Sequence, residues 1–120
     1  MNDTSLLLVD DEAALVDLLK KYLERLGFQV RTYTDPHAAV RVFEAEPHRF
    51  SLVVADLTLP GMSGEEMVER MRAFRPGLPA IIASGYAYQP RAHGIEFLQK
   101  PFLPKMLADV IRRILNAAKS

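Results

Sequence analysis

The 120-residue sequence contains no cysteine. This excludes disulfides and thiolate metal sites and is consistent with a reducing compartment. No apolar run approaches the ~18 residues that span a membrane, and the N-terminus lacks the basic and apolar segments of a signal peptide. Fifteen basic and fifteen acidic residues leave no formal net charge, so the basic excess of a nucleic-acid-binding protein is missing. We expect a cytoplasmic protein that binds neither membrane nor nucleic acid.

Repeats, low-complexity tracts and linkers are also lacking. The chain of 13.5 kDa is 49% hydrophobic, which is enough for one core without covalent cross-links. A single domain over residues 1–120 is therefore expected.

Short apolar runs alternate with stretches that have helical spacing. The runs predict strands at residues 5–9, 28–33, 52–55, 79–83 and 95–98. Helices are predicted between them, ending at Gly27, starting at Asp35–Pro36, at about residues 65–74 with two acids in the first turn, and from about residue 103 onwards. Regular alternation favours an α/β fold with parallel strands and helices on both faces of the sheet. The helical spacing assigns to the core, among others, Leu18, Met67, Met71, Phe74, Leu103 and Met106.

Polar residues follow the predicted strands. Asp10 and Asp11 follow the first strand, and Asp56 follows the third. Ser84 follows the fourth and Lys100 the fifth. Because the carboxyl ends of parallel strands meet at one edge, these five side chains should converge there.

Three converging acids must either take up protons or be joined by a compensating cation. Two carboxylates ~4 Å apart repel by roughly 4 kcal/mol at an effective dielectric near 20. An all-oxygen ligand set favours Mg²⁺, and Lys100 adds an ammonium group. A carboxylate beside both cations can act as a nucleophile towards a phosphoryl group. The resulting aspartyl phosphate would bring up to about two negative charges, which is a switch input.

Four stretches together, "LLLVDDE", "VVADLTLPGMSG", "IIASGY" and "FLQKPF", resemble the receiver domain of two-component response regulators. The resemblance implies a flavodoxin-like sheet with strand order 2-1-3-4-5, and Asp56 as phosphoacceptor. It implies Mg²⁺ bound by Asp11 directly, by Asp10 mainly through water, by Asp56 and by the Thr58 carbonyl. Further implied roles are Lys100 as partner of the acid or phosphate, Ser84 and Phe97 as switch residues, and a cis bond before Pro101.

The same resemblance implies a module that catalyses only its own phosphorylation and dephosphorylation. The implied donor is a histidine kinase or a histidine phosphotransfer protein, with a monomer or weak dimer as the assembly. The "ASGY" stretch resembles receivers of hybrid histidine kinases. We expect a stand-alone receiver or one domain of a longer protein.

Residues 85–94, "GYAYQPRAHG", depart from the family pattern. A parallel crossover normally needs a dozen or more residues and usually contains a helix. This one has ten, with a proline in the middle and a glycine at each end. We expect the family's fourth helix to be absent or cut to about one turn, with Tyr86 and Tyr88 partly covering the sheet.

Simpler interpretations remain open for each polar residue. Asp10 and Asp11 could be helix N-caps, Asp56 could start an Asx-turn and Ser84 could belong to a turn. Lys100 could be an ordinary surface residue. The three histidines, His37, His48 and His93, are interpreted as surface residues.

Two other functions also remain. One is a receiver-like interaction module that acts without phosphorylation. The other is a Mg²⁺-dependent phosphatase of small molecules. Such enzymes often carry a second acid two residues after the nucleophile, where this sequence has Thr58.

Overall fold

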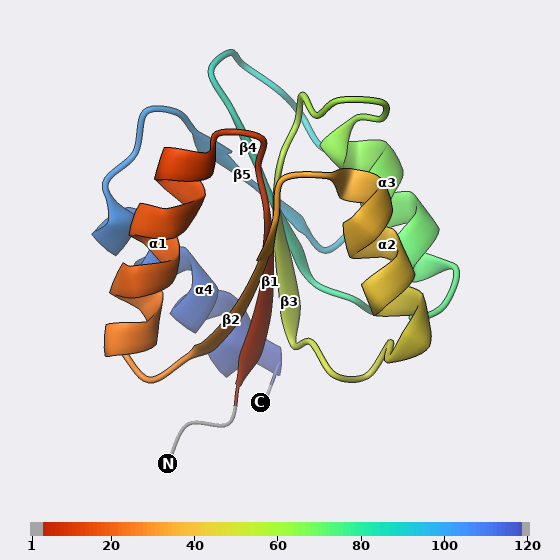
Figure 1. Ribbon diagram of the computed structural model, residues 1–120, viewed down its shortest axis with the longest axis horizontal. Coiled ribbons are helices and arrows are strands. Elements are labelled where there is room, and N and C mark those ends of the chain that lie inside the picture. The colour runs from red at the N-terminus through yellow and green to blue at the C-terminus, as the bar shows by residue number, and fades with distance from the viewer. Residues whose placement is uncertain (1–3, 119–120) are drawn as a thin grey trace.

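The computed structural model describes residues 4–118. Within them a five-stranded parallel sheet has the order β2-β1-β3-β4-β5, which confirms the predicted flavodoxin-like topology. Helices α1 and α4 cover one face of the sheet and α2 and α3 the other (Figure 1). The elements are β1 (Ser5–Val9), α1 (Ala13–Arg25), β2 (Gln29–Tyr33), α2 (Pro36–Ala45), β3 (Leu52–Asp56), α3 (Gly64–Arg72), β4 (Ala80–Ser84), β5 (Ile95–Gln99) and α4 (Pro104–Ala118).

The strand register aligns the carboxyl ends at one edge. Val9 pairs with Ala55, Asp56 with Ala83, and Ser84 with Gln99. The residues at or just after these ends are the polar ones noted in the sequence. The register therefore places them along one rim of the sheet.

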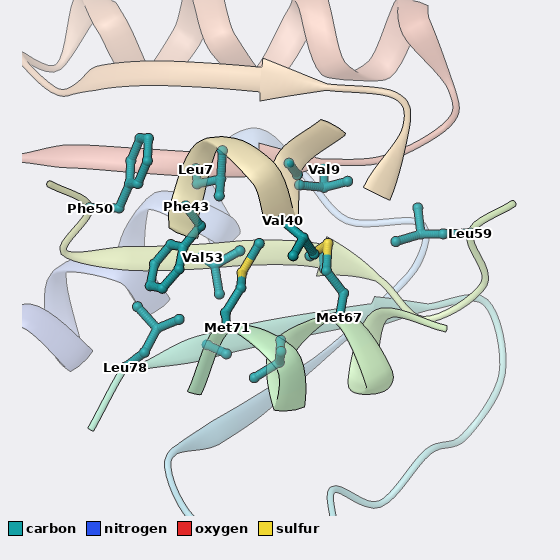
Figure 2. Close-up of a cluster of buried hydrophobic side chains, with 14 of the residues drawn as sticks. Leu7, Val9, Val40, Phe43, Phe50, Val53, Leu59, Met67, Met71 and Leu78 are labelled. Carbon is teal, nitrogen blue, oxygen red and sulfur yellow. The ribbon is translucent and has the colours of Figure 1, made fainter. Parts of the chain in front are cut away.

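Each face of the sheet packs against its own layer of helices. On the face of α2 and α3, Leu7 and Val53 contribute to a cluster with Phe43, Met67 and Met71 (Figure 2). On the other face, residues such as Leu6 and Val54 pack with residues of α1 and α4. Because both faces are covered, β1, β3 and β4 are continuous apolar runs rather than alternating ones.

Several helix ends follow the expected chemistry. The Asp35 carboxylate accepts a hydrogen bond from the His37 N–H at 3.0 Å, with Pro36 at the first helical position. Gly27, just after α1, has φ of 100°, a conformation that glycine adopts without steric cost. Ser63 caps α3 by accepting from the Glu66 N–H. These local signals explain why the predicted boundaries lie close to the observed ones.

Four apolar residues assigned to the core are exposed instead, so that part of the prediction is wrong. The exposed fraction is 55% for Leu18, 48% for Phe74, 68% for Leu103 and 46% for Met106. Phe74 lies beyond the end of α3 and Leu103 precedes α4. Helical spacing identifies an apolar stripe, but the width of the stripe that becomes covered depends on the neighbouring elements.

No helix lies between β4 and β5 in the described part of the chain. The prediction for residues 85–94 is therefore confirmed, and we call this segment the strap. It runs over the top of the molecule in Figure 1. His37, His48 and His93 are exposed, as expected. Within residues 4–118 no helix combines the length and the apolar character needed to cross a membrane.

Candidate functional site

Three acids meet at the carboxyl edge of the sheet. Asp10 and Asp11 directly follow β1, and Asp56 ends β3. One carboxylate oxygen from each lies within 4.8 Å of the other two. Asp10 is buried at 4% exposure, Asp56 is partly buried and Asp11 is exposed. The cluster thus reaches solvent at Asp11.

The Asp10 carboxylate also organises the start of α1. Its Oδ1 accepts a hydrogen bond from the Glu12 N–H at 2.9 Å. The N-cap position itself belongs to Glu12, whose side chain makes no capping bond. The simple N-cap interpretation of Asp10 and Asp11 is therefore wrong.

The Lys100 ammonium group lies among the carboxylates. Its Nζ is 2.8 Å from Asp10 Oδ2 and 3.4 Å from Asp56 Oδ1. A third acid, Glu12, lies 3.2 Å away. The position of Glu12 directly after Asp10 and Asp11 was the only sequence signal that it would contact Lys100. Lys100 is therefore not an ordinary surface lysine.

The electrostatics of the cluster favour bound cations. Burial alone would lower the pKa of Lys100, but the hydrogen bond and charge of Asp10 and the charge of Asp56 raise it above its usual value. The pKa of Asp56 is raised, mainly by burial, with Lys100 opposing the shift and the charges of Asp10 and Asp11 adding to it. The single ammonium group faces three clustered carboxylates, so further positive charge is favourable at this site.

These residues fit a Mg²⁺ ion. The donors are hard oxygens from acids on two strand ends, close enough to share one ion. Thr58, which the resemblance adds to the ligand set, lies in the loop two residues after Asp56, where it pairs with Ser63. Lys100 follows β5, and the Lys100–Pro101 bond is cis.

Ser84 ends β4, beside β3, and Tyr86 reaches Thr58 in the loop after Asp56. Ser84 is 2% exposed, and its Oγ accepts a hydrogen bond from the Tyr86 N–H at 3.2 Å. The Tyr86 hydroxyl lies 3.0 Å from Thr58 Oγ1, so either oxygen can donate. Tyr86 is 63% exposed. The prediction that Tyr86 covers the sheet is therefore wrong.

Tyr88, in contrast, does pack on the sheet. It contacts the cluster beneath α2 and α3, and its ring meets Phe97 of β5 edge-on, with centroids 6.1 Å apart. Phe97 is only partly buried. Tyr88 therefore covers part of the sheet in the absence of a helix between β4 and β5.

A hollow of about 450 Å³ opens beside the cluster. Its lining includes Glu12, Leu15, Lys100 and Phe102. The exposed Leu103 and Met106 follow Phe102 in the chain, and Leu18 lies one helical turn after Leu15. The prediction that Leu18, Leu103 and Met106 are core residues therefore missed an apolar surface next to the charged site.

Comparison with known proteins assigns the chain to a family. Residues 6–112 match the family model described as "Response regulator receiver domain". This chain belongs to that family. The receiver domain from the hybrid histidine kinase CckA superposes with a TM-score of 0.84 at 27% identity, covering 92% of this chain and 98% of that one. A CheY-like receiver domain from Methanospirillum hungatei gives a TM-score of 0.88 at 29% identity, covering 98% of each chain.

Curated relatives include transcriptional regulators. The transcriptional regulatory protein FixJ of Bradyrhizobium diazoefficiens is 35% identical over 93% of this chain and 58% of its own length. CssR of Bacillus subtilis is 32% identical over 91% of this chain and 50% of its own. This receiver domain thus spans about half the length of these relatives. Its similarity extends both to a kinase-attached receiver and to receivers of transcriptional regulators.

Proposed function

We propose that Asp56 of this receiver domain accepts a phosphoryl group from a phosphohistidine in a Mg²⁺-dependent reaction. The donor is a histidine kinase or a histidine phosphotransfer protein. The observation that carries the proposal is the convergence of Asp10, Asp11, Asp56 and Lys100 on one rim. A carboxylate partly shielded from water beside an ammonium group is suited to nucleophilic attack on phosphorus.

Each residue then has a chemical role. Asp11, Asp56 and the Thr58 carbonyl would hold Mg²⁺ directly, and Asp10 through water. The ion, when bound, neutralises charge on the phosphoryl oxygens. An Asp56 carboxylate oxygen forms the new bond to phosphorus while the bond from phosphorus to the donor's imidazole nitrogen breaks. Lys100 stabilises the charge on the transferred group, and the Ser84 hydroxyl donates to a phosphoryl oxygen.

The surface beside the site suits a protein donor. Leu18, Leu103 and Met106 are large, apolar and exposed, and such side chains near an open polar site favour contact with another protein. The donor's histidine could then approach Asp56 from the solvent-facing side of the cluster. Phosphorylation acts as a switch, in which Ser84 and Phe97 rearrange and alter contacts with cytoplasmic partners.

Phosphorylation by a small donor tests the assignment. The protein is incubated with acetyl phosphate and Mg²⁺, and mass spectrometry measures the gain of one phosphoryl group. We expect labelling of the wild type that hydroxylamine removes, as it does from acyl phosphates. Labelling should disappear in Asp56→Asn and when Mg²⁺ is chelated. The control is Asp17→Asn, which removes an exposed acid paired with Lys21 on α1 and should label normally.

The opposite result identifies the alternative. Equal labelling of Asp56→Asn and the wild type would refute the phosphoacceptor role. If the wild type takes no phosphoryl group, the interaction module that acts without phosphorylation gains support. Turnover of a generic phosphomonoester would instead support the phosphatase.

A further inference from the structure

The strap is fastened to α3 at both ends of that helix. Glu65, in the first turn of α3, is 6% exposed. Its Oε2 accepts hydrogen bonds from the Tyr88 hydroxyl and, at 3.4 Å, from the Arg91 N–H, and its Oε1 pairs with Arg91 Nη2 at 3.1 Å. At the other end of α3, Arg72 donates to the His93 carbonyl at 2.7 Å. Polar side chains at both ends of α3 thus bind the strap.

The Glu65 contacts are energetically substantial. A buried carboxylate is costly unless donors compensate it, and Tyr88 and Arg91 of the strap supply these donors. The Tyr88 hydrogen bond is the main reason that the pKa of Glu65 lies below its ordinary value. Opening the strap would expose this carboxylate and separate Tyr88 from Phe97. The closed strap is therefore a defined state rather than a loose loop.

The strap is also connected to the phosphoacceptor end of β3. Gly64, which precedes Glu65, donates to the Leu57 carbonyl at 2.8 Å, and a Cβ at Gly64 would lie 2.2 Å from the Asp56 carbonyl oxygen. The start of α3 is thus tightly packed on the Asp56 segment. The strap is also attached where it begins, because Ser84 Oγ at the end of β4 accepts a hydrogen bond from the Tyr86 N–H.

We propose that Glu65 is a positioning residue that holds the strap closed through Tyr88, so that strap closure and phosphoryl occupancy of Asp56 oppose each other. This inference rests on the proposed phosphoacceptor function. When the Ser84 side chain turns to a phosphoryl oxygen on Asp56, its Oγ leaves the Tyr86 N–H and the strap loses its first hydrogen bond. Because coupling between two sites is reciprocal, a change that loosens the strap must raise the affinity of the site for a phosphoryl group.

Hydrogen exchange in Tyr88→Phe tests whether the strap opens as a unit. This change removes the hydroxyl that binds Glu65 and keeps the ring on Phe97. We expect the Tyr86 and Arg91 amides, neither of which bonds to the Tyr88 hydroxyl, to exchange roughly tenfold faster, as the loss of one charge-assisted hydrogen bond predicts. Amides of β1 should be unchanged. The control Tyr22→Phe removes a hydroxyl from the opposite face of the sheet.

Affinity for beryllium fluoride, a phosphoryl analogue, tests the coupling. In the presence of Mg²⁺, Tyr88→Phe should bind it more tightly than the wild type by about the factor seen in exchange. Glu65→Gln, which keeps an acceptor oxygen and removes the charge, should shift affinity in the same direction. Equal affinity of wild type and variants, despite faster exchange, overturns the coupling only. Unchanged exchange in Tyr88→Phe overturns the claim that Glu65 holds the strap closed through Tyr88. A wild type that does not bind beryllium fluoride overturns the proposed function as well.

Discussion

Replacing Asp56 with asparagine should stabilise the fold when Mg²⁺ is absent. The Asp56 oxygen lies within 4.8 Å of one oxygen from each of Asp10 and Asp11, and each repulsion at that distance is about 3.5 kcal/mol at an effective dielectric of 20. The attraction to Lys100 at 3.4 Å is about 5 kcal/mol on the same scale. The repulsions together exceed the attraction by about 2 kcal/mol. Because Asp11 is exposed, screening reduces the expected gain to about 1–2 kcal/mol.

Urea denaturation at neutral pH with a chelator measures this gain directly. The matched control is Asp17→Asn, whose carboxylate pairs with Lys21 at 3.0 Å on the surface and should change stability by less than about 0.5 kcal/mol. Excess Mg²⁺ should stabilise the wild type more than Asp56→Asn, because the variant lacks one charged ligand. An Asp56→Asn protein that is no more stable than the wild type would refute the charge-crowding argument.

The pH dependence of the gain has a definite sign. The pKa of Asp56 lies above its ordinary value of 3.8, so the folded protein binds this proton more tightly than the unfolded chain does. The cost of the charged form is complete above the raised folded-state pKa, and it disappears as the pH falls to 3.8. The advantage of Asp56→Asn should therefore shrink as denaturation curves are recorded at decreasing pH. A gain that grows towards low pH would contradict the reasoning.

Three further substitutions, two of them paired with a control substitution, are informative. Lys100→Met leaves the buried Asp10 without its cationic partner and should lower the free energy of unfolding, measured with urea, by about 3 kcal/mol. Excess Mg²⁺ should restore part of this stability. An unchanged free energy of unfolding would show that the ammonium group does not compensate the acids. Gly64→Ala places a Cβ 2.2 Å from a carbonyl oxygen and should cost about 2 kcal/mol, whereas Gly77→Ala, with no atom within 4 Å, should be within about 0.5 kcal/mol of the wild type. Phe43→Ala empties a fully buried position and should lower the free energy of unfolding by about 3–5 kcal/mol; Phe74→Ala, at 48% exposure, should cost far less, and equal losses would argue against the two-layer core.

The acidic edge and the missing helix were both accessible from the sequence. Asp10, Asp56 and Lys100 follow apolar runs, and parallel topology brings such ends together. The strap could be anticipated because Pro90 interrupts a ten-residue crossover bounded by glycines. These inferences succeed because period, length and turn residues are local properties of the chain.

The sequence did not reveal the partners of Glu65 in the strap. Glu65 read only as an acid in the first turn of a helix, but its carboxylate is buried beneath Tyr88 and Arg91, more than twenty residues away. Similarly, the helical stripe predicted burial of Leu18 and Met106, which lie in the open. Burial depends on which neighbour reaches a given side chain, and a periodic pattern carries no information on that neighbour.

The sequence by itself therefore determined the alternation of strands and helices, and with it the one rim where the acids and the lysine gather. Only the tertiary structure decided how the charges are shared there and what the strap binds. Periodicity specifies which face of an element is apolar. The positions of Lys100 and Glu65 relative to their partners depend instead on packing between segments far apart in the chain.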